Sequence, residues 1–139
     1  MELVERWQRG ELVTLSEDEC RQLLGTQTLG RVAYNDDEGP VVTPVNYAVD
    51  GGTLLVATSP ESQLARHAPA AAVALEVDQI DADRHSGWSV VVRGHAEVVA
   101  YADLPASHTA RPAPWTAGDR TLYLRIAAST VTGRRLLPA

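Results

Sequence analysis

The sequence predicts one mainly β domain over residues 1–139: a small antiparallel barrel, closed or partly closed, of about six strands with a few short helices. Three observations predict this fold. Hydrophobic residues make up 45% of the 139 positions, which suits one domain with a single core. Several segments alternate apolar and polar residues, as strands with one buried face do. Short turn sequences join most of these segments, which favours hairpins.

The first predicted element is a short helix in LSEDECRQLLG, residues 15–25. Ser16 can cap this helix, and Glu19 three residues later completes a capping box. The acidic residues of the first turn suit the positive end of the helix dipole. Gly25 is placed to end the helix.

Six further segments have the apolar, β-branched composition of strands: 29–35, 41–50, 53–58, 71–80, 87–99 and 120–129. Gly51 and Gly52 predict a hairpin turn between the second and third of them. Pro44 has no N–H to donate to a ladder, so we expect its strand to be irregular or to lie at an edge there. Residues 131–139 are expected to form a short tail.

The segment 87–99, GWSVVVRGHAEVV, is the longest predicted strand. One face runs from Trp88 to Val98 and is apolar throughout, so it is assigned to the core. The other face carries Arg93, His95 and Glu97 and is expected to point outward, where the charges can pair across strands.

Two segments between the strands have a different character. SPESQLARHA, residues 59–68, predicts a second helix with Ser59 as the N-cap and Pro60 at the first helical position. Residues 101–115 contain three prolines and predict an interrupted helix or a loop.

Composition excludes several classes of function. The formal net charge is −6, and all twelve basic residues are arginines, so a nucleic-acid partner is not expected. The chain contains no apolar run of membrane-spanning length, and its N-terminal segment lacks the apolar core of a signal peptide. We therefore expect a cytoplasmic protein with no membrane partner.

The sequence assigns no catalytic residue and no metal site. Cys20 is the single cysteine, and its place in a predicted helix favours a small buried hydrophobe over a nucleophile. The four histidines do not fall at metal-ligand spacing with one another or with carboxylates.

Two segments are candidates for binding a ligand. TSPESQLAR places Thr58, Ser59, Ser62 and Arg66 at or near a helix start, a suitable place for a phosphate. The alternative is that Ser59 only caps the helix. In TPVNY, residues 43–47, the proline interrupts the strand, and the freed backbone groups of this segment can meet the edge of a planar heterocycle.

Taken in order, these segments resemble the pyridoxamine 5′-phosphate oxidase-like family, the FMN-binding split barrels. The matching pieces are LGRVAY, GPVVTPVNYAVDGGTLLVATSPESQLA, AVALEVDQID, GWSVVVRGHAEVV, and PW before RTLYLRIAASTVTGRRL. The resemblance covers nearly all of residues 16–136 and is to the small single-domain actinobacterial members. It implies a six-stranded antiparallel split β-barrel and a homodimer with FMN in two clefts between subunits. It also implies an oxidoreductase that transfers hydride or electrons to a small-molecule substrate.

The resemblance further implies which residues hold the cofactor. Residues along the isoalloxazine ring would be Pro44, Val45 and Asn46. Residues around the ribityl phosphate would be Thr58, Ser59, Ser62, Gln63 and Arg66. The partner subunit would supply Trp88 and Ser89, and Trp115 would cover the cleft.

Gln63 departs from the family, because many relatives have a basic residue at this position to pair with the phosphate. The loss of such a charge-assisted contact costs about 1.5–3 kcal/mol, or about one to two decades of affinity. Arg66 or Arg31 is the expected substitute.

Three alternatives remain open within the resemblance. Some members use a deazaflavin coenzyme, which usually calls for more basic residues than this acidic chain has. Others bind haem, for which His67 or His108 would be the axial ligand. The third alternative is a flavin-binding or storage protein without turnover.

Overall fold

The structure, a computed structural model, describes residues 10–113, 115 and 122–138. Within them lie seven strands, one more than the sequence predicts: β1 (Glu11–Thr14), β2 (Leu29–Asp36), β3 (Gly39–Asp50), β4 (Thr53–Thr58), β5 (Ala72–Asp81), β6 (Ser86–Val99) and β7 (Leu122–Leu137). The helical elements are α2 (Glu17–Leu24), α3 (Gln63–His67) and two 3₁₀ turns, η1 (Tyr101–Asp103) and η2 (His108–Ala110).

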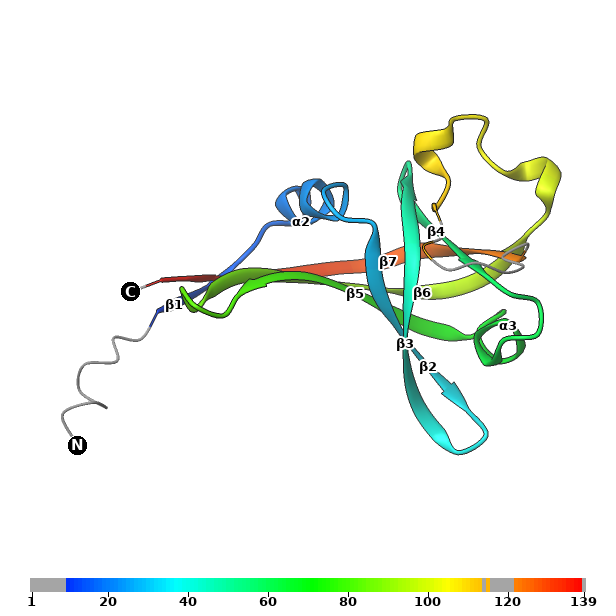
Figure 1. The fold of residues 1–139 in the computed structure, drawn as a ribbon, viewed down its shortest axis with the longest axis horizontal. Coiled ribbons are helices and arrows are strands. Elements are labelled where there is room, and N and C mark those ends of the chain that lie inside the picture. The colour runs from blue at the N-terminus through cyan, green and yellow to red at the C-terminus, as the bar shows by residue number, and fades with distance from the viewer. Residues whose placement is uncertain (1–9, 114, 116–121, 139) are drawn as a thin grey trace.

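All strand pairings are antiparallel, in the order β1-β7-β4-β3-β2-β5-β6, and β6 also pairs with β7 (Figure 1). This last pairing closes six strands into a ring, which confirms the predicted six-stranded barrel. The extra strand, β1, only extends the far end of β7. The ring is weakly closed at one place, because β2 and β5 pair over just three residues.

The hydrophobic core fills the interior of the ring, and every strand of the ring contributes side chains from its inner face. Along β6 the side chains from Trp88 to Ala96 alternate between buried and more exposed positions, as predicted. The assignment of Val98 to the core is wrong, because its side chain is 52% exposed. The reason is that β5 begins opposite His95, so β6 has no β5 neighbour at Val98.

The prediction of a tail over residues 131–139 is wrong, because β7 runs without a break to Leu137. Gly133 lies where the chain has no room for a side chain. A Cβ atom there would be 2.6 Å from the Cys20 sulfur and 2.9 Å from the Ser89 carbonyl oxygen. The glycine therefore marks close packing of α2 on the sheet and not the end of the strand.

Helix α2 begins and ends as the sequence predicts. Ser16 Oγ accepts a hydrogen bond from the Glu19 N–H, and the Glu19 carboxylate accepts one from the Ser16 N–H, which confirms the capping box. Burial raises the pKa of the Cys20 thiol, consistent with a packing role on the inner side of the helix. The buried Tyr47 hydroxyl donates to the Leu24 carbonyl and so ties the end of α2 to β3.

The prediction that Ser59 caps the second helix is wrong. Helix α3 starts at Gln63, and its N-cap is Ser62, whose Oγ accepts a hydrogen bond from the Ala65 N–H at 3.0 Å. Residues 59–62 form a separate turn, closed by a bond from the Ser62 N–H to the Ser59 carbonyl. Because Ser59 Oγ accepts from the Glu61 N–H within that turn, it is not available as a helix cap.

Residues 100–113 pack on the outer side of β3 and β4. Leu54 and Val56 belong to the main core, whereas Leu55 between them is fully buried on the opposite face. The 3₁₀ turn η2 contacts β3 on this side, and Leu104 is buried there too. Residues 100–113 thus cover a second, smaller apolar layer.

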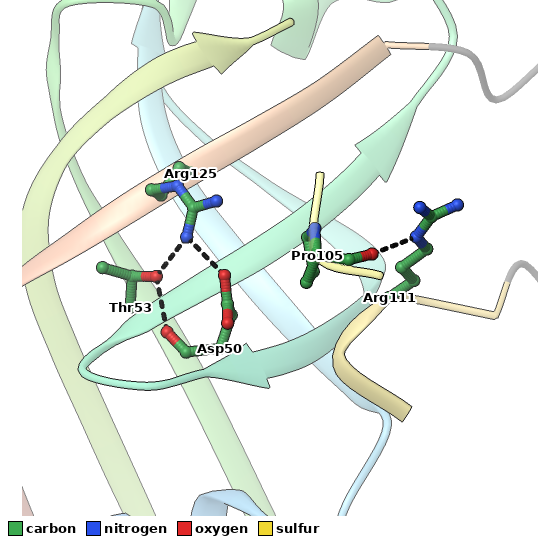
Figure 2. Close-up of polar contacts among 5 residues, drawn as sticks. All are labelled: Asp50, Thr53, Pro105, Arg111 and Arg125. Carbon is green, nitrogen blue, oxygen red and sulfur yellow. Dashed lines mark hydrogen bonds and ion pairs between the residues drawn. The ribbon is translucent and has the colours of Figure 1, made fainter. Parts of the chain in front are cut away.

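One arginine holds the β3–β4 hairpin and another holds the 100–113 segment, as Figure 2 shows. Arg125 on β7 donates to the Asp50 carboxylate at 2.8 Å and to Thr53 Oγ1 at 2.7 Å, which holds the β3–β4 hairpin. Arg111 donates to the Pro105 carbonyl at 2.6 Å, which folds the 100–113 segment back on itself. No helix among the described residues is long and apolar enough to cross a membrane.

Candidate functional site

A groove with a volume of about 510 Å³ opens where β3 and β4 separate. The two strands pair only from Tyr47 to Asp50 on β3, so the earlier part of β3 has a free edge. Helix α3 follows β4 and lies beside this edge. The groove brings together seven residues that the sequence analysis places at a cofactor: Pro44, Val45, Asn46, Thr58, Ser62, Gln63 and Trp115.

The free edge of β3 presents an ordered set of backbone groups to the groove. The Tyr47 N–H donates to the Thr28 carbonyl on the β2 side at 3.0 Å. Backbone groups alternate in direction along an antiparallel strand, so those of Asn46 and Pro44 point to the opposite, free edge. Because proline has no N–H, Pro44 offers this edge only a carbonyl oxygen, and Asn46, at the end of the ladder with β4, offers an N–H donor. A planar heterocycle that carries ring N–H and carbonyl groups complements this set.

The Asn46 side chain holds the groove together. Its Oδ1 accepts a hydrogen bond from the Trp115 N–H at 3.0 Å, and its Nδ2 lies 3.5 Å from the Thr28 carbonyl oxygen. The Trp115 side chain is 68% exposed at the mouth of the groove. Asn46 therefore positions an aromatic residue beside the space where a ligand would lie.

A pair of hydroxyls lies at the α3 end of the groove. Thr58 is buried, and its Oγ1 lies 2.8 Å from Ser62 Oγ, which also accepts the Ala65 N–H. Only one hydroxyl hydrogen is used between the two oxygens, whichever of them donates. The other hydroxyl hydrogen remains available, so the pair can always donate to an oxyanion in the groove.

Gln63 stands beside this pair. Its Oε1 lies 3.1 Å from His67 Nε2 one turn along α3, which leaves the amide NH₂ group to donate elsewhere. Arg66 does not line the groove, and its guanidinium group makes no hydrogen bond or ion pair with another described residue. Among the described residues that line the groove there is no positively charged side chain.

Ser59, Trp88 and Ser89 do not line the groove of their own chain. Ser59 belongs to the turn before α3. Trp88 and Ser89 begin β6 at the β5–β6 turn, at the opposite end of the molecule from α3 (Figure 1). The Trp88 side chain is buried in the core, whereas Ser89 lies on the outer face. The contribution of Trp88 and Ser89 from a second subunit stays a prediction.

Arg31, the other expected substitute for a basic residue at position 63, is held elsewhere. Its Nη1 lies 3.3 Å from Glu76 Oε1 and 3.3 Å from Asp78 Oδ2, both on the outer face of β5. Burial of Glu76, and next the nearby Asp78 carboxylate, raise the pKa of Glu76 to about 7, although Arg31 lowers it. The Arg31 guanidinium thus pairs with the carboxylates of both Glu76 and Asp78.

This cluster predicts a pH dependence of stability. Because the Glu76 pKa is higher in the folded chain than in the unfolded one, the folded state binds more protons between pH 4.5 and 7, and the free energy of unfolding falls as pH rises through this window. Glu76→Gln keeps an acceptor for Arg31 and removes the charge. After allowance for solvent screening, we expect this variant to gain about 1 kcal/mol at pH 8 and little at pH 4.5.

Urea denaturation of the wild type, Glu76→Gln and the control Glu38→Gln at both pH values measures this effect. Glu38 is exposed in the β2–β3 turn. An equal gain for the two variants at pH 8, or a gain for Glu76→Gln at both pH values, contradicts the prediction.

Comparison with known proteins bears on this site. The sequence of residues 16–135 matches the family described as Pyridoxamine 5'-phosphate oxidase. The chain belongs to this family. The uncharacterized protein Rv0080 of Mycobacterium tuberculosis is 31% identical over 132 residues, which cover 91% of this chain and 87% of that protein.

Two solved structures extend the comparison. The FAD binding protein from Mycobacterium smegmatis is 30% identical with a TM-score of 0.70, and the match covers 90% of this chain and 98% of that one. A putative pyridoxamine 5'-phosphate oxidase from Corynebacterium glutamicum is 29% identical with a TM-score of 0.72, covering 92% and 95%. The fold is therefore the split barrel of this family.

Six residues of the groove are not predicted from the sequence. They are Leu29 and Tyr34 from β2, Val41 and Thr43 from β3, Ala57 from β4 and Leu64 from α3. A signal for the β2 residues does exist, because the turn between Asp36 and Gly39 sets the register that pairs Leu29 with Asn46. Without that register, the alternation along β2 shows only which side chains face inward.

Proposed function

We propose that this protein is a cytoplasmic flavoprotein that binds FMN in the groove between β3, β4 and α3 and transfers hydride or electrons to a small-molecule substrate. The observation that carries the proposal is the groove itself. One end of the groove is a free strand edge whose backbone groups complement a planar heterocycle, and the other end holds a pair of hydroxyls. The chain also belongs to a family with flavin-binding relatives.

The ring end of the groove supports an isoalloxazine. The carbonyl of Pro44 and the N–H of Asn46 are placed to meet a ring donor and a ring acceptor in the plane of the strand. Val45 and Leu29 supply apolar surface, and the exposed Trp115 can cover one face of the ring. A flavin bound here supplies the redox chemistry, and the protein supplies orientation and exclusion of water.

The α3 end supports the ribityl phosphate. The spare hydroxyl hydrogen of the Thr58–Ser62 pair and the Gln63 amide are neutral donors to phosphate oxygens. The described groove-lining residues include no carboxylate, histidine or cysteine. The proposal is therefore simple hydride transfer without an acid or base side chain.

The proposal includes a homodimer with one cofactor in each of two clefts. Trp88 and Ser89 do not line the groove of their own chain, so in this proposal a second copy brings them to a cofactor. Val42, 62% exposed on β3 near the groove, is apolar surface that a second copy would cover.

A titration tests the proposal. The protein is purified without added flavin, its visible spectrum is recorded, and FMN fluorescence is followed as protein is added. Quenching at micromolar protein supports the flavin site. A Soret band would instead favour haem on His67 or His108, and a colourless protein that leaves FMN unquenched contradicts the proposal.

The same preparation separates related cofactors. The Mycobacterium smegmatis relative is by its name a FAD binding protein, and FAD contains the same ring, ribityl chain and first phosphate as FMN. Mass spectrometry of the flavin released on denaturation distinguishes FMN from FAD and from a deazaflavin. Bound flavin that NAD(P)H fails to reduce would favour a binding or storage protein.

A substitution tests the phosphate end directly. Thr58→Val keeps the shape of the side chain and removes the Thr58 hydroxyl, so a phosphate that Thr58 Oγ1 contacts loses that hydrogen bond, whereas the Ser62 hydroxyl remains. We expect FMN affinity to fall about 10-fold, the effect of one hydrogen bond to a charged group. Riboflavin, which lacks the phosphate, serves as the matched ligand, and its affinity is expected to stay within about 2-fold.

Equal losses for FMN and riboflavin would show that Thr58→Val disturbs the groove in general. Thr43→Val is the matched control variant, since Thr43 lines the groove on β3 and is not part of the hydroxyl pair. A loss of FMN affinity with Thr43→Val as large as with Thr58→Val would place the phosphate elsewhere.

A further inference from the structure

The proposed phosphate site lacks a positive charge. A phosphate monoester carries about −1.5 to −2 charges at pH 7, and the chain itself has a formal net charge of −6. The donors at the α3 end of the groove, on Thr58, Ser62 and Gln63, are all neutral. A dianion held by neutral donors alone in an acidic protein is poorly compensated.

Most arginines of the described chain are already committed. Arg31 pairs with Glu76 and Asp78, and the others that make hydrogen bonds or ion pairs with described residues are Arg21, Arg84, Arg111 and Arg125. The side chains of Arg66, Arg93, Arg134 and Arg135 make none with the described residues. Arg134, on β7, is exposed. It is therefore free to compensate a charge that its own chain does not hold.

The register of β6 and β7 sets where Arg134 points. Ser89 lies directly opposite Arg134, so the two side chains share one face of the sheet with their Cα atoms about 5 Å apart. Gly133 lies on the inner face, where it packs against Cys20, so Arg134 next to it faces outward. Any surface that receives Ser89 must therefore also receive Arg134.

We propose that Arg134 of the partner subunit supplies the positive charge at the phosphate end of the groove and takes the place of a basic residue at position 63. This inference rests on the proposed function, in which Ser89 of the partner subunit reaches the cleft. It assigns the missing charge to a residue more than 70 positions away in sequence from the groove elements that it completes.

The charge of Arg134 is not neutralised within its own face of the sheet. Asp78, Ser89 and Arg134 lie in one row across β5, β6 and β7. The Asp78 carboxylate in that row is already paired with Arg31. Arg134 at the other end of the row is therefore left for a charge outside its own chain.

Binding of FMN and riboflavin to Arg134→Gln tests the proposal. We expect FMN affinity to fall about 10- to 100-fold, as for loss of one charge-assisted contact, with riboflavin affinity unchanged. Arg93→Gln is the matched control, since Arg93 lies on the same outer face of β6 and faces Thr130. Arg66→Gln tests the nearest arginine of the same chain, and neither control is expected to change FMN affinity by more than about 2-fold.

Unchanged FMN affinity in Arg134→Gln overturns the proposal, and so does an equal loss for riboflavin that Arg134→Lys does not restore. A wild type that binds neither flavin removes the proposed function itself, which is a different result. Light scattering shows whether Arg134→Gln keeps the oligomeric state of the wild type. A monomeric wild type that binds FMN overturns the proposal as well.

Mixed dimers decide whether the arginine acts across the interface. Gln63→Glu places a negative charge at the phosphate end of its own groove and is expected to weaken FMN binding. In a dimer of one Arg134→Gln and one Gln63→Glu subunit, action in trans leaves one groove with both Gln63 and Arg134 intact. We expect one of the two sites to recover wild-type affinity, whereas action within one chain would leave neither site intact.

Discussion

Gly94→Ala is expected to destabilise the fold by about 3 kcal/mol or more. A Cβ atom at this position would lie 1.8 Å from the Ala127 carbonyl oxygen and 2.9 Å from its carbon. Both are backbone atoms, so relief requires β6 and β7 to move apart at the place where the ring closes. The register of the two strands shifts there, because Ser129 is an extra residue on β7.

Urea denaturation followed by circular dichroism measures this loss, with Gly52→Ala as control. Gly52 lies in the β3–β4 turn, and a Cβ there would meet nothing within 4 Å, so its substitution should change the free energy of unfolding by less than about 0.5 kcal/mol. Equal stability of the two variants would show that β6 and β7 are not so close at Gly94.

Leu55→Ala is expected to lower the free energy of unfolding by about 3 kcal/mol. Leu55 is fully buried, yet it lies outside the main core, beneath the segment 100–113. Its loss leaves a cavity that this segment can only partly fill. The same chain segment leads to Trp115, whose N–H is bonded to Asn46, so the variant should also bind FMN more weakly.

Thermal and urea unfolding measure the first effect, and the FMN titration measures the second. Val98→Ala on β6 is the control, since that side chain is 52% exposed and its truncation should cost less than about 0.5 kcal/mol. Undiminished FMN affinity in Leu55→Ala would show that the cover over β3 and β4 does not position Trp115.

Local sequence rules predict most of the elements. The capping box at Ser16 and Glu19 needs only residues that are neighbours along the chain, and α2 begins there. The alternation from Trp88 to Ala96 predicts the inner face of β6, since side chains of a strand alternate whatever its partners are.

Features that depend on distant segments could not be predicted in this way. Residues 131–139 read as a tail, but β7 continues to Leu137, and the contact that requires Gly133 involves Cys20 and Ser89, far away in sequence. Val98 fits an apolar face, but its exposure depends on where β5 begins. Ser59 and Ser62 are both plausible caps, and only the closed turn before α3 distinguishes them.

Some residues of the candidate site could likewise be predicted from the sequence, and others depend on how distant strands pair. Pro44, Asn46, Thr58 and Ser62 come from two short stretches, and the resemblance brings them together without knowledge of the register. The contribution of Leu29 and Tyr34 follows only from the pairing of β2 with β3. The opposition of Ser89 and Arg134 likewise requires the observed pairing of β6 with β7.

The free edge of β3 has a consequence for the behaviour of the protein in concentrated solution. Pro40 and Pro44 both occupy positions whose backbone faces away from β2, so two of the N–H groups that an incoming strand would need are absent. The edge therefore accepts a small ring with its own donors but is a poor template for adding another polypeptide strand. The prolines that open the groove to a ligand thus also protect the barrel from growing into ordered aggregates.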